Sequence, residues 1–323
     1  MIGHTCKVHS HTITNIMQQE YKEQEALVKQ ASFVNALSSV SQQIMGREYA
    51  YEKVQYQTHF SLPLKRNIFG LLTIPVMIND KKCTFIVDTG AQISGIKSTK
   101  VKELNIRKTE HKVCIGSIGG TQKQLQGLCI NKVVLGAIAY YNVPMIALGE
   151  KDFSMRFGNI DLFNFDGILG WDILSQLDFE LDDINHQFIV LKNRFRFTNP
   201  NMIAGGFPCF LTKLADGSIS LFGFDSGSKV SWIGENMIRK QKYAIIQEGN
   251  AFGFGVHGLE KMKLKIVDNC VLYLDKAEIK LSNTMSGRTN LFDNFSFDGV
   301  LGNEIFKGRR MRFVNSCNMV LIA

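Results

Sequence analysis

Two short sequence elements occur twice in this chain, in the same order and at nearly the same spacing. The first is an apolar run that ends in Asp-Thr-Gly or Asp-Ser-Gly, with its aspartates at Asp88 and Asp225. The second is Phe-Asp-Gly followed by two apolar residues and Gly, and it ends at Gly170 and again at Gly302. The aspartates lie 137 residues apart and the glycines 132. The repeat predicts two related lobes within one chain.

The residues around the repeat differ in composition and in hydrophobic pattern from the N-terminal residues. From Leu62 onward, short runs of Val, Ile, Leu and Phe are separated by Gly, Asn or Asp, which is typical of an all-β sandwich or barrel. From Ile13 to Val54 there is no Pro and a single Gly, and apolar residues recur at helical spacing. We therefore expect a helical N-terminal segment (1–60), a first lobe (61–197) and a second lobe (198–323).

Composition excludes several classes of function. The formal net charge is +8, but the densest basic cluster, 309–312, is short and alternates with apolar residues as an edge strand does. We therefore predict no nucleic-acid partner. No window is apolar enough for a spanning helix, and the N-terminus lacks the apolar run of a signal peptide, so we expect no transmembrane segment. Seven widely spaced cysteines without a CxxC pair predict a reducing cytoplasmic location rather than a disulfide framework.

The repeated Asp-Thr/Ser-Gly element has a chemical meaning. An apolar strand that ends in Asp delivers a carboxylate at the strand's end, and the next hydroxyl can hydrogen-bond across a two-fold axis. Gly then lets two backbones approach closely. If two such halves face each other, their carboxylates come within about 3 Å and share one proton, because like charges at that distance do not both ionise. The candidate catalytic residues are thus Asp88 and Asp225.

These motifs resemble those of the retropepsin-like and pepsin-like aspartic proteases, in the single-chain, two-lobe form of bacterial retropepsin-like proteins. The shared-proton dyad is a known property of that family. The resemblance covers residues from about 62 to 323, and it implies an all-β fold of two pseudo-symmetric retropepsin-like β-barrel lobes. It also implies that an apolar-apolar-Gly strand crosses each active-site loop in a psi-shaped arrangement. The residues concerned are Thr89, Gly90 and Ala91 with Ser226, Gly227 and Ser228 around the dyad, and Ile168, Leu169 and Gly170 with Val300, Leu301 and Gly302 in the psi elements.

The resemblance also implies hairpin flaps over the cleft. Each half has a Gly-rich segment between its two motifs, and neither carries the flap Tyr of pepsin-like enzymes, so a two-flap cleft is favoured. The candidate flap residues are Ser117, Ile118, Gly119 and Gly120 in the first lobe, and Val256, His257 and Gly258 in the second.

The leading hypothesis is an aspartic endopeptidase that cleaves extended peptides with water activated between Asp88 and Asp225, without cofactor or metal. A narrow role in processing a precursor or leader peptide is expected, because unrestricted proteolysis in a cytoplasm is toxic. The alternative is a catalytically silent peptide-binding or assembly module. Its expected signature is loss of one Asp, and this chain has kept both. A third hypothesis makes the N-terminal helices a partner-binding arm.

The N-terminal segment allows two further interpretations. It either packs over the cleft and restrains activity, or it packs on the lobes or dimerises, so that the protein is a monomer or a dimer. By analogy with zymogens of pepsin-like relatives, Lys65 or Arg66 would pair with the catalytic carboxylates. Four residues near the terminus could in principle bind a metal, but their spacing matches no zinc site and a disordered tail is expected. They are His4, Cys6, His9 and His11.

The two active-site loops differ at one position, where the second lobe has Ser228 and the first has Ala91. A hydroxyl at this position in the family can donate into the carboxylate network. We therefore expect Asp225 to be the more acidic member of the pair and Asp88 to hold the shared proton. Asp166 and Asp298, each before a Gly, are expected to be turn residues rather than catalytic ones.

Overall fold

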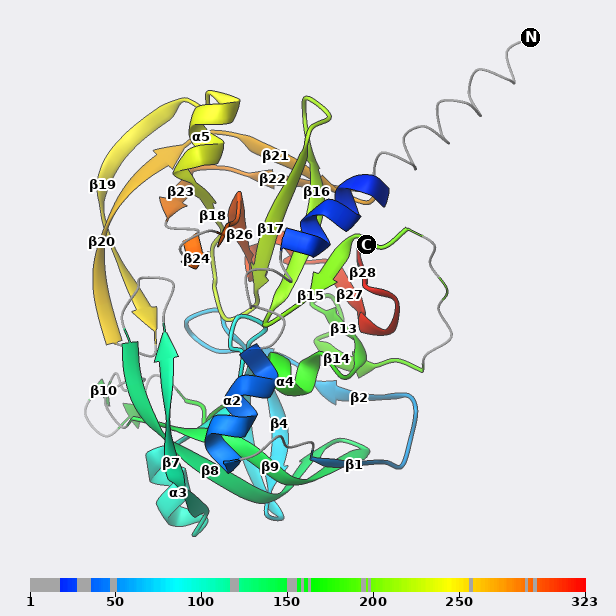
Figure 1. Cartoon of the computed structure of the whole chain (residues 1–323), viewed down its shortest axis with the longest axis vertical. Coiled ribbons are helices and arrows are strands. Elements are labelled where there is room, and N and C mark those ends of the chain that lie inside the picture. The colour runs from blue at the N-terminus through cyan, green and yellow to red at the C-terminus, as the bar shows by residue number, and fades with distance from the viewer. Residues whose placement is uncertain are drawn as a thin grey trace.

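The computed structural model describes residues 18–27, 36–46, 51–116, 122–149, 156–157, 160–161, 164–192, 196, 199–255, 258–287, 290–292 and 295–323. Strands dominate the described residues, which confirms the prediction of a mainly β chain. Two large sheets, one in the lower and one in the upper half of Figure 1, are joined by a smaller sheet at the right of the picture.

The lower sheet is built from the first half of the chain. Among the described residues it has nine strands, in the order β1-β9-β6-β12-β5-β4-β8-β7, with β3 beside β4. Its strands are β1 (Glu52–Gln55), β3 (Lys65–Arg66), β4 (Leu72–Ile78), β5 (Lys81–Val87), β6 (Gly95–Lys97), β7 (Arg107–Gly116), β8 (Gln122–Leu135), β9 (Ile138–Leu148) and β12 (Gly167–Leu169). Two short helices accompany it, α3 (Ser98–Glu103) and α4 (Trp171–Leu174), with the small hairpin β10 (Arg156–Phe157) and β11 (Ile160–Asp161).

The upper sheet is built from the second half and repeats the same plan. Its ten described strands run in the order β19-β20-β23-β18-β26-β17-β16-β21-β22, with β15 beside β16. They are β15 (Met202–Ala204), β16 (Pro208–Leu214), β17 (Ile219–Asp225), β18 (Trp232–Gly234), β19 (Ile245–Gly255), β20 (Gly258–Val267), β21 (Cys270–Leu274), β22 (Ala277–Leu281), β23 (Thr284–Gly287) and β26 (Gly299–Gly302). The helices α5 (Glu235–Gln241) and η1 (Asn303–Phe306) and the hairpin β24 (Asn290–Phe292) and β25 (Phe295–Ser296) accompany this sheet.

The register of the central strands shows how closely the halves correspond. In the lower sheet β12 runs parallel to β5, with Gly167 opposite Phe85. In the upper sheet β26 runs parallel to β17, with Gly299 opposite Phe222. The two glycines occupy the same place in the repeated motif, so the repeat in the sequence is a repeat in strand pairing. Each central strand is buried, which explains its nearly continuous apolar sequence.

A third sheet connects the lobes. Its described strands lie in the order β2-β14-β13-β27-β28, where β2 (Phe60–Pro63), β13 (Asp178–Asp182) and β14 (Gln187–Val190) come from the first half. The strands β27 (Arg310–Val314) and β28 (Met319–Ile322), separated by η2 (Asn315–Cys317), come from the second half. Aromatic rings stack beneath this sheet, with the centroids of Phe179 and Phe313 4.6 Å apart. The two halves therefore share one hydrophobic core.

The basic cluster near the C-terminus does not form the edge strand that the sequence predicted. The strand that contains it, β27, pairs with β13 on one side and β28 on the other. Its arginines face acidic residues of β13, with 2.7 Å between Arg312 Nε and Glu180 Oε2 and 3.1 Å between Arg310 Nε and Asp182 Oδ2. These ion pairs therefore balance the positive charge of the two arginines within the sheet.

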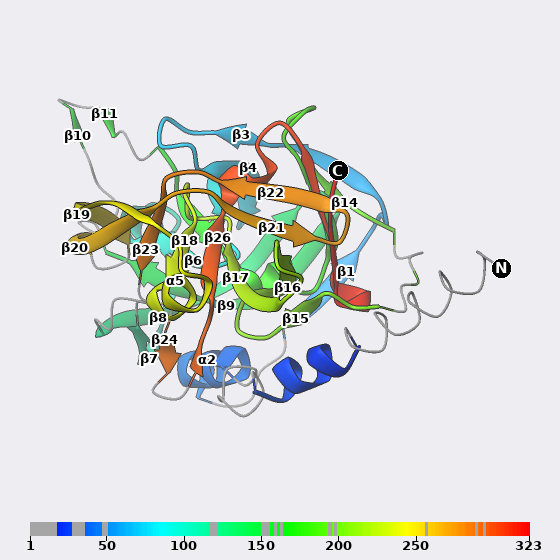
Figure 2. The ribbon, with the colours of Figure 1, turned by 90° about the horizontal axis from the view of Figure 1, so that it is seen from above.

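The described part of the N-terminal segment contains two helices, over residues 18–27 and at α2 (Ala36–Met45). Figure 2 shows both on the same side of the molecule. Tyr21 of the first helix is buried against the upper lobe, and its hydroxyl donates to the carbonyl oxygen of Met202 at 3.3 Å. The chain enters the lower sheet at Glu52, earlier than the boundary expected near residue 61, because β1 pairs with β9.

Candidate active site

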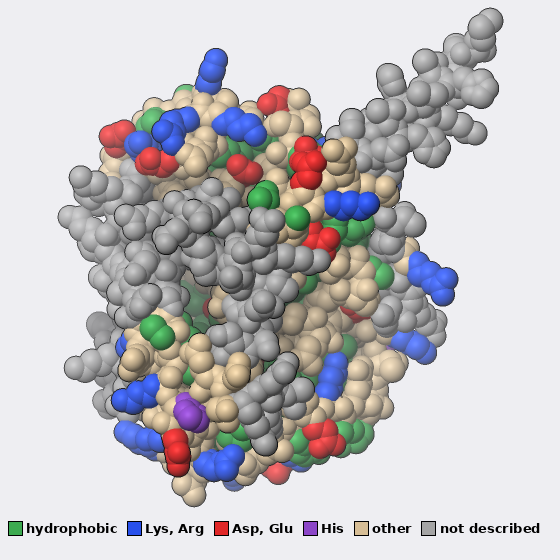
Figure 3. All heavy atoms as spheres, in the orientation of Figure 1, with side chains coloured by type: hydrophobic (Ala, Val, Ile, Leu, Met, Phe, Trp, Pro, Cys, Tyr) green, Lys and Arg blue, Asp and Glu red, His purple; other side chains and the backbone are tan. Residues whose placement is uncertain are grey.

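The carboxyl groups of Asp88 and Asp225 lie against each other where the two lobes meet. A Cβ built on Gly90 would stand 2.5 Å from Cγ of Asp225, and one on Gly227 would stand 2.5 Å from Cγ of Asp88. Each carboxyl therefore occupies the space that a side chain on the opposite loop would need. The two carboxyls also hydrogen-bond to each other. In Figure 3 a hollow is visible between the lobes on this face of the molecule.

Backbone amides fix one oxygen of each carboxyl. The N–H groups of Gly90 and Ala91 donate to Oδ1 of Asp88 at 2.9 and 3.0 Å. The N–H of Gly227 donates to Oδ1 of Asp225 at 2.8 Å. These bonds hold the carboxyl planes in place and leave the remaining oxygens for the partner carboxyl and a bound water.

The hydroxyls that follow the aspartates cross between the lobes. Thr89 Oγ1 donates to the carbonyl oxygen of Phe224 at 2.9 Å, and Ser226 Oγ donates to that of Val87 at 2.8 Å. Each hydroxyl also accepts the other residue's backbone N–H, at 2.9 and 3.0 Å. Because Thr89 and Ser226 are fully buried, these four bonds are shielded from water.

The apolar-apolar-Gly strands support both loops from behind. The N–H of Asp88 donates to the carbonyl oxygen of Leu169 at 3.0 Å, and Gly170 lies so close that an added Cβ would be 2.8 Å from the carbonyl oxygen of Ala91. In the second lobe Gly302 is equally confined, by the backbone of Val230. The remaining members of these elements, Ile168, Val300 and Leu301, are buried.

The aspartates of the repeated Phe-Asp-Gly element have matching structural contacts. Asp166 Oδ2 accepts the N–H of Thr84 at 2.8 Å, and Asp298 Oδ2 accepts that of Leu221 at 2.9 Å. Both carboxylates therefore complete strand ends, in agreement with the turn role expected from the sequence.

Burial raises the pKa of both dyad carboxyls. Burial raises the pKa of Asp88, and the N–H groups of Ala91 and Gly90 oppose that effect. The pKa of Asp225 is raised well above its ordinary value, first by burial and then by the negative charge of Asp88. Both shifts favour a proton held between the two carboxyls, with Asp225 as the less acidic member.

This order of acidity is the reverse of the one expected from Ser228. The Ser228 hydroxyl donates to the carbonyl oxygen of Val230 at 2.8 Å, so it turns away from the carboxyl pair. Only the backbone of Ser228 contributes to the stabilisation of the Asp225 carboxylate, as the backbone of Ala91 does for Asp88. The difference in side chain between the loops therefore gives the second lobe no extra donor.

The predicted flap residues fall largely outside the described part of the chain. Ser117, Ile118, Gly119, Gly120, Val256 and His257 are not described, and Gly258 is the first residue of β20. The strands leading to them are described, and they pair up to Gly116 opposite Gln122 and to Gly255 opposite Gly258. Figure 1 shows the β7–β8 and β19–β20 arms approaching each other from the two lobes.

Arg66 does not reach the dyad, contrary to the zymogen analogy. Its Nε lies 2.8 Å from Oδ1 of Asp183, and its Nη1 donates to Oδ1 of Asn303 at 2.8 Å. Asn303 in turn donates from Nδ2 to the carbonyl oxygen of Ser226 at 3.2 Å. Arg66 thus supports the second active-site loop from outside, while Lys65 lies beside it in β3.

Two serines behind the loops were missed in the sequence. Ser94 Oγ accepts the N–H of Gly170 and Ser231 Oγ accepts that of Gly302, both at 2.9 Å. Each serine lies six residues after its catalytic-loop aspartate, so extending the repeat past Ala91 and Ser228 would have identified them.

Comparison with known proteins identifies the first lobe's relatives. Residues 74–173, which include the Asp88 loop and its psi element, match a family model described as aspartyl protease. A retropepsin-like aspartic protease from Rickettsia conorii is a structural match at 19% sequence identity, over 44% of this chain and 95% of that one, with a TM-score of 0.28. A search of curated proteins found no match. The family model therefore confirms the resemblance to aspartic proteases over residues 74–173.

The described residues offer no metal site. They contain no cluster of three or more metal-ligating side chains, and the candidate ligands His4, Cys6, His9 and His11 lie outside them. None of the described helices has the length and apolar character needed to cross a membrane. The six cysteines in the described part of the chain are free thiols.

Proposed function

We propose that this protein is an aspartic endopeptidase that uses Asp88 and Asp225 as its catalytic pair. The observation that carries the proposal is the packing of each carboxyl against the opposite loop's glycine, with no room for a Cβ at Gly90 or Gly227. This arrangement brings two acids together in one site, where a single shared proton makes one of them a base and the other an acid.

The proposed mechanism follows from the order of acidity. Asp88, the ionised member, takes a proton from a water held between the carboxyls, and that water attacks the carbonyl carbon of the peptide. The protonated Asp225 donates a hydrogen bond to the developing oxyanion. A proton then passes to the leaving nitrogen as the C–N bond breaks, which yields a carboxylic acid and an amine.

We propose that the substrate is a peptide or protein segment bound in extended form between the lobes, beneath the β7–β8 and β19–β20 arms. A cytoplasmic location fits the six free thiols of the described chain. In that compartment a narrow role, such as processing a precursor or leader peptide, is the form of activity that a cell tolerates.

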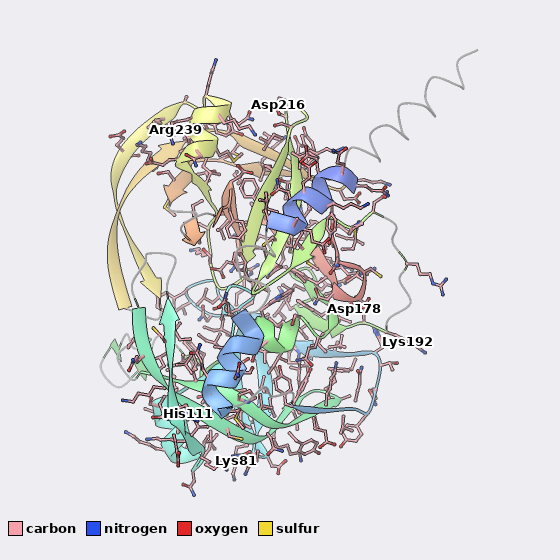
Figure 4. All side chains as sticks on the ribbon, in the orientation of Figure 1. Lys81, His111, Asp178, Lys192, Asp216 and Arg239 are labelled. Carbon is pink, nitrogen blue, oxygen red and sulfur yellow. The ribbon has the colours of Figure 1, made fainter. Side chains whose placement is uncertain are left out.

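We further propose that the N-terminal segment restrains the enzyme. Ile44 of α2 is fully buried in a cluster with Ile93 and Ile168, and partly buried Ala91 of the active-site loop packs on the same cluster. Gly46, just after α2, lies against His111 of β7, which Figure 4 places beside the helix. A substrate that runs along this face of the lower lobe would compete with α2.

The experiment that tests the proposed activity is proteome-scale peptide profiling with the purified full chain. Cleavage that a pepstatin-like transition-state mimic suppresses is the expected result, because the central hydroxyl of the mimic replaces the attacking water. Binding of that mimic without any cleavage would instead support the silent peptide-binding module. If neither cleavage nor binding occurs, the proposed site is wrong.

A further inference from the structure

A second acid, Asp172, is buried directly behind the Asp88 loop. It is 8% exposed and lies in α4, two residues after Gly170. Its Oδ1 accepts the hydroxyl proton of Ser94 at 2.7 Å, and its Oδ2 has no hydrogen-bond partner among the described residues. A buried acid with an unpartnered oxygen is costly, so a structural role alone does not account for it.

The hydrogen bonds around Ser94 have only one possible direction when Asp172 is ionised. The N–H of Gly170 must donate, so Ser94 Oγ accepts it at 2.9 Å and directs its own proton to Asp172. The next residue, Trp171, donates its N–H to the carbonyl oxygen of Ala91 at 2.7 Å. Ala91 is also a donor to the Asp88 carboxylate. An uninterrupted set of contacts therefore leads from Asp172 to the dyad.

The second lobe has a different arrangement at the same place. Glu304 occupies the position that corresponds to Asp172, but its Oε1 accepts the backbone N–H of Ser231 at 2.7 Å rather than the hydroxyl. Burial raises the pKa of Asp172 to about 7, opposed by its bonds to Ser94. The charge of Asp172 behind the Asp88 loop therefore changes near neutral pH.

We propose that Asp172 is a positioning residue that acts through Ser94 to hold Gly170 and the Asp88 loop in their catalytic geometry. The inference rests on the proposed endopeptidase activity for its functional part. A carboxylate accepts a hydroxyl proton more strongly than a neutral acid does, so the ionised form fixes the loop more firmly. The ionisation of Asp172 thus makes the order of the Asp88 loop depend on pH.

The groups that face Asp172 come from three other elements. Ser94 approaches from the segment before β6, and the Tyr51 hydroxyl donates to the backbone carbonyl oxygen of Asp172 at 2.7 Å. Tyr140 of β9 lies close enough for the acid's charge to raise its pKa further. None of these is a cation, so an ionised Asp172 depends on Ser94 and on backbone N–H groups for its stabilisation.

The test compares Ser94→Ala, Asp172→Ala and Asp172→Asn in the full chain. Asn keeps an oxygen that can accept from Ser94 but does not titrate, so it separates geometry from charge. We expect Ser94→Ala and Asp172→Ala to lower kcat about 10-fold with KM within about 2-fold, on a peptide taken from the cleavage profile. We expect Asp172→Asn to retain most of the activity at low pH. Its plot of kcat against pH should lack the change near pH 7 that the ionisation of Asp172 produces in the parent.

Amide hydrogen exchange supplies a measurement that does not need activity. We expect faster exchange over residues 88–94 in Ser94→Ala and Asp172→Ala, with residues 277–281 of the upper lobe unchanged as the internal reference. Asp182→Asn is the matched control, since it removes a buried acid outside this network and should leave the loop as in the parent. Unchanged loop exchange together with parent-like kcat and pH profile would overturn the inference. If the parent cleaves nothing, the proposed function fails and exchange alone decides the inference.

Discussion

Thr89 Oγ1 donates a hydrogen bond to the carbonyl oxygen of Phe224, 2.9 Å away in the other lobe. The bond joins the first active-site loop to the strand that carries Asp225. A hydroxyl at this position therefore fixes the separation of the two carboxyls rather than taking part in the reaction.

Replacing this hydroxyl should uncouple the lobes. We expect Thr89→Val to lower the free energy of unfolding by about 1–3 kcal/mol, because the Phe224 carbonyl and the Ser226 N–H lose their buried partner. Cleavage should fall as well. The control is Thr212→Val, which removes an equally buried hydroxyl that bonds within one lobe to Ser220. Urea unfolding and kcat/KM are the measurements, and equal loss of activity in both variants would contradict the coupling role.

A methyl group on the first active-site glycine should disrupt the carboxyl pair. We expect Gly90→Ala to abolish cleavage, since its Cβ would stand 2.5 Å from Cγ of Asp225 and the carboxyl would have to move. Gly249→Ala is the matched control, because nothing lies within 4 Å of a Cβ there. Rates on the profiled peptide test this, and an active Gly90→Ala would mean that the carboxyls are farther apart than described.

Asp172 should make stability depend on pH. Its pKa of about 7 in the folded protein exceeds the ordinary value of 3.8 for Asp, so between about pH 4 and 7 the folded state binds more protons than the unfolded state. Stability from this group is then present at low pH and is lost as pH rises through the window, by at most about 1.4 kcal/mol per unit. Asp172→Asn should remove that loss. Unfolding free energies of parent and variant at pH 4, 5.5 and 7 give the comparison, and a constant difference would refute it.

The proposed restraint by α2 predicts opposite changes in stability and activity. We expect Ile44→Ala to lower the free energy of unfolding by about 2–5 kcal/mol, since Ile44 is fully buried, yet to raise kcat/KM as α2 loosens. Ile279→Ala in the upper lobe is the control for destabilisation alone. A fall in activity in both variants would favour α2 as a packing element without a restraining role.

The sequence predicted the class of fold because the repeat constrains strand pairing as well as composition. The register that places Gly167 opposite Phe85 and Gly299 opposite Phe222 follows the repeated motifs residue by residue. The sheet between the lobes was not predicted. It pairs Asp178–Asp182 with Arg310–Val314, strands more than 100 residues apart in the chain, and no local pattern marks such a pairing.

The directions of individual side chains were also not predictable from the sequence. Ser228 was expected to face the dyad, but a rotation about one bond directs its hydroxyl to the carbonyl oxygen of Val230. Arg66 was expected at the carboxyl pair, and Asp183, far along the chain, binds it instead. Both outcomes depend on partners that only the folded chain brings close, whereas Asp88 and Asp225 were identified because their motif is local.

The central claim is that Asp88 and Asp225 act together on one water. Its most direct test is kcat/KM of the parent, Asp88→Asn and Asp225→Asn on a peptide from the cleavage profile, with circular dichroism and urea unfolding to verify the fold. Each Asn variant retains the shape of the carboxyl but cannot exchange the shared proton, so the account predicts that cleavage is abolished in both while the fold is kept. If either folded variant retained most of the parent's kcat/KM, the paired-carboxyl mechanism would be contradicted.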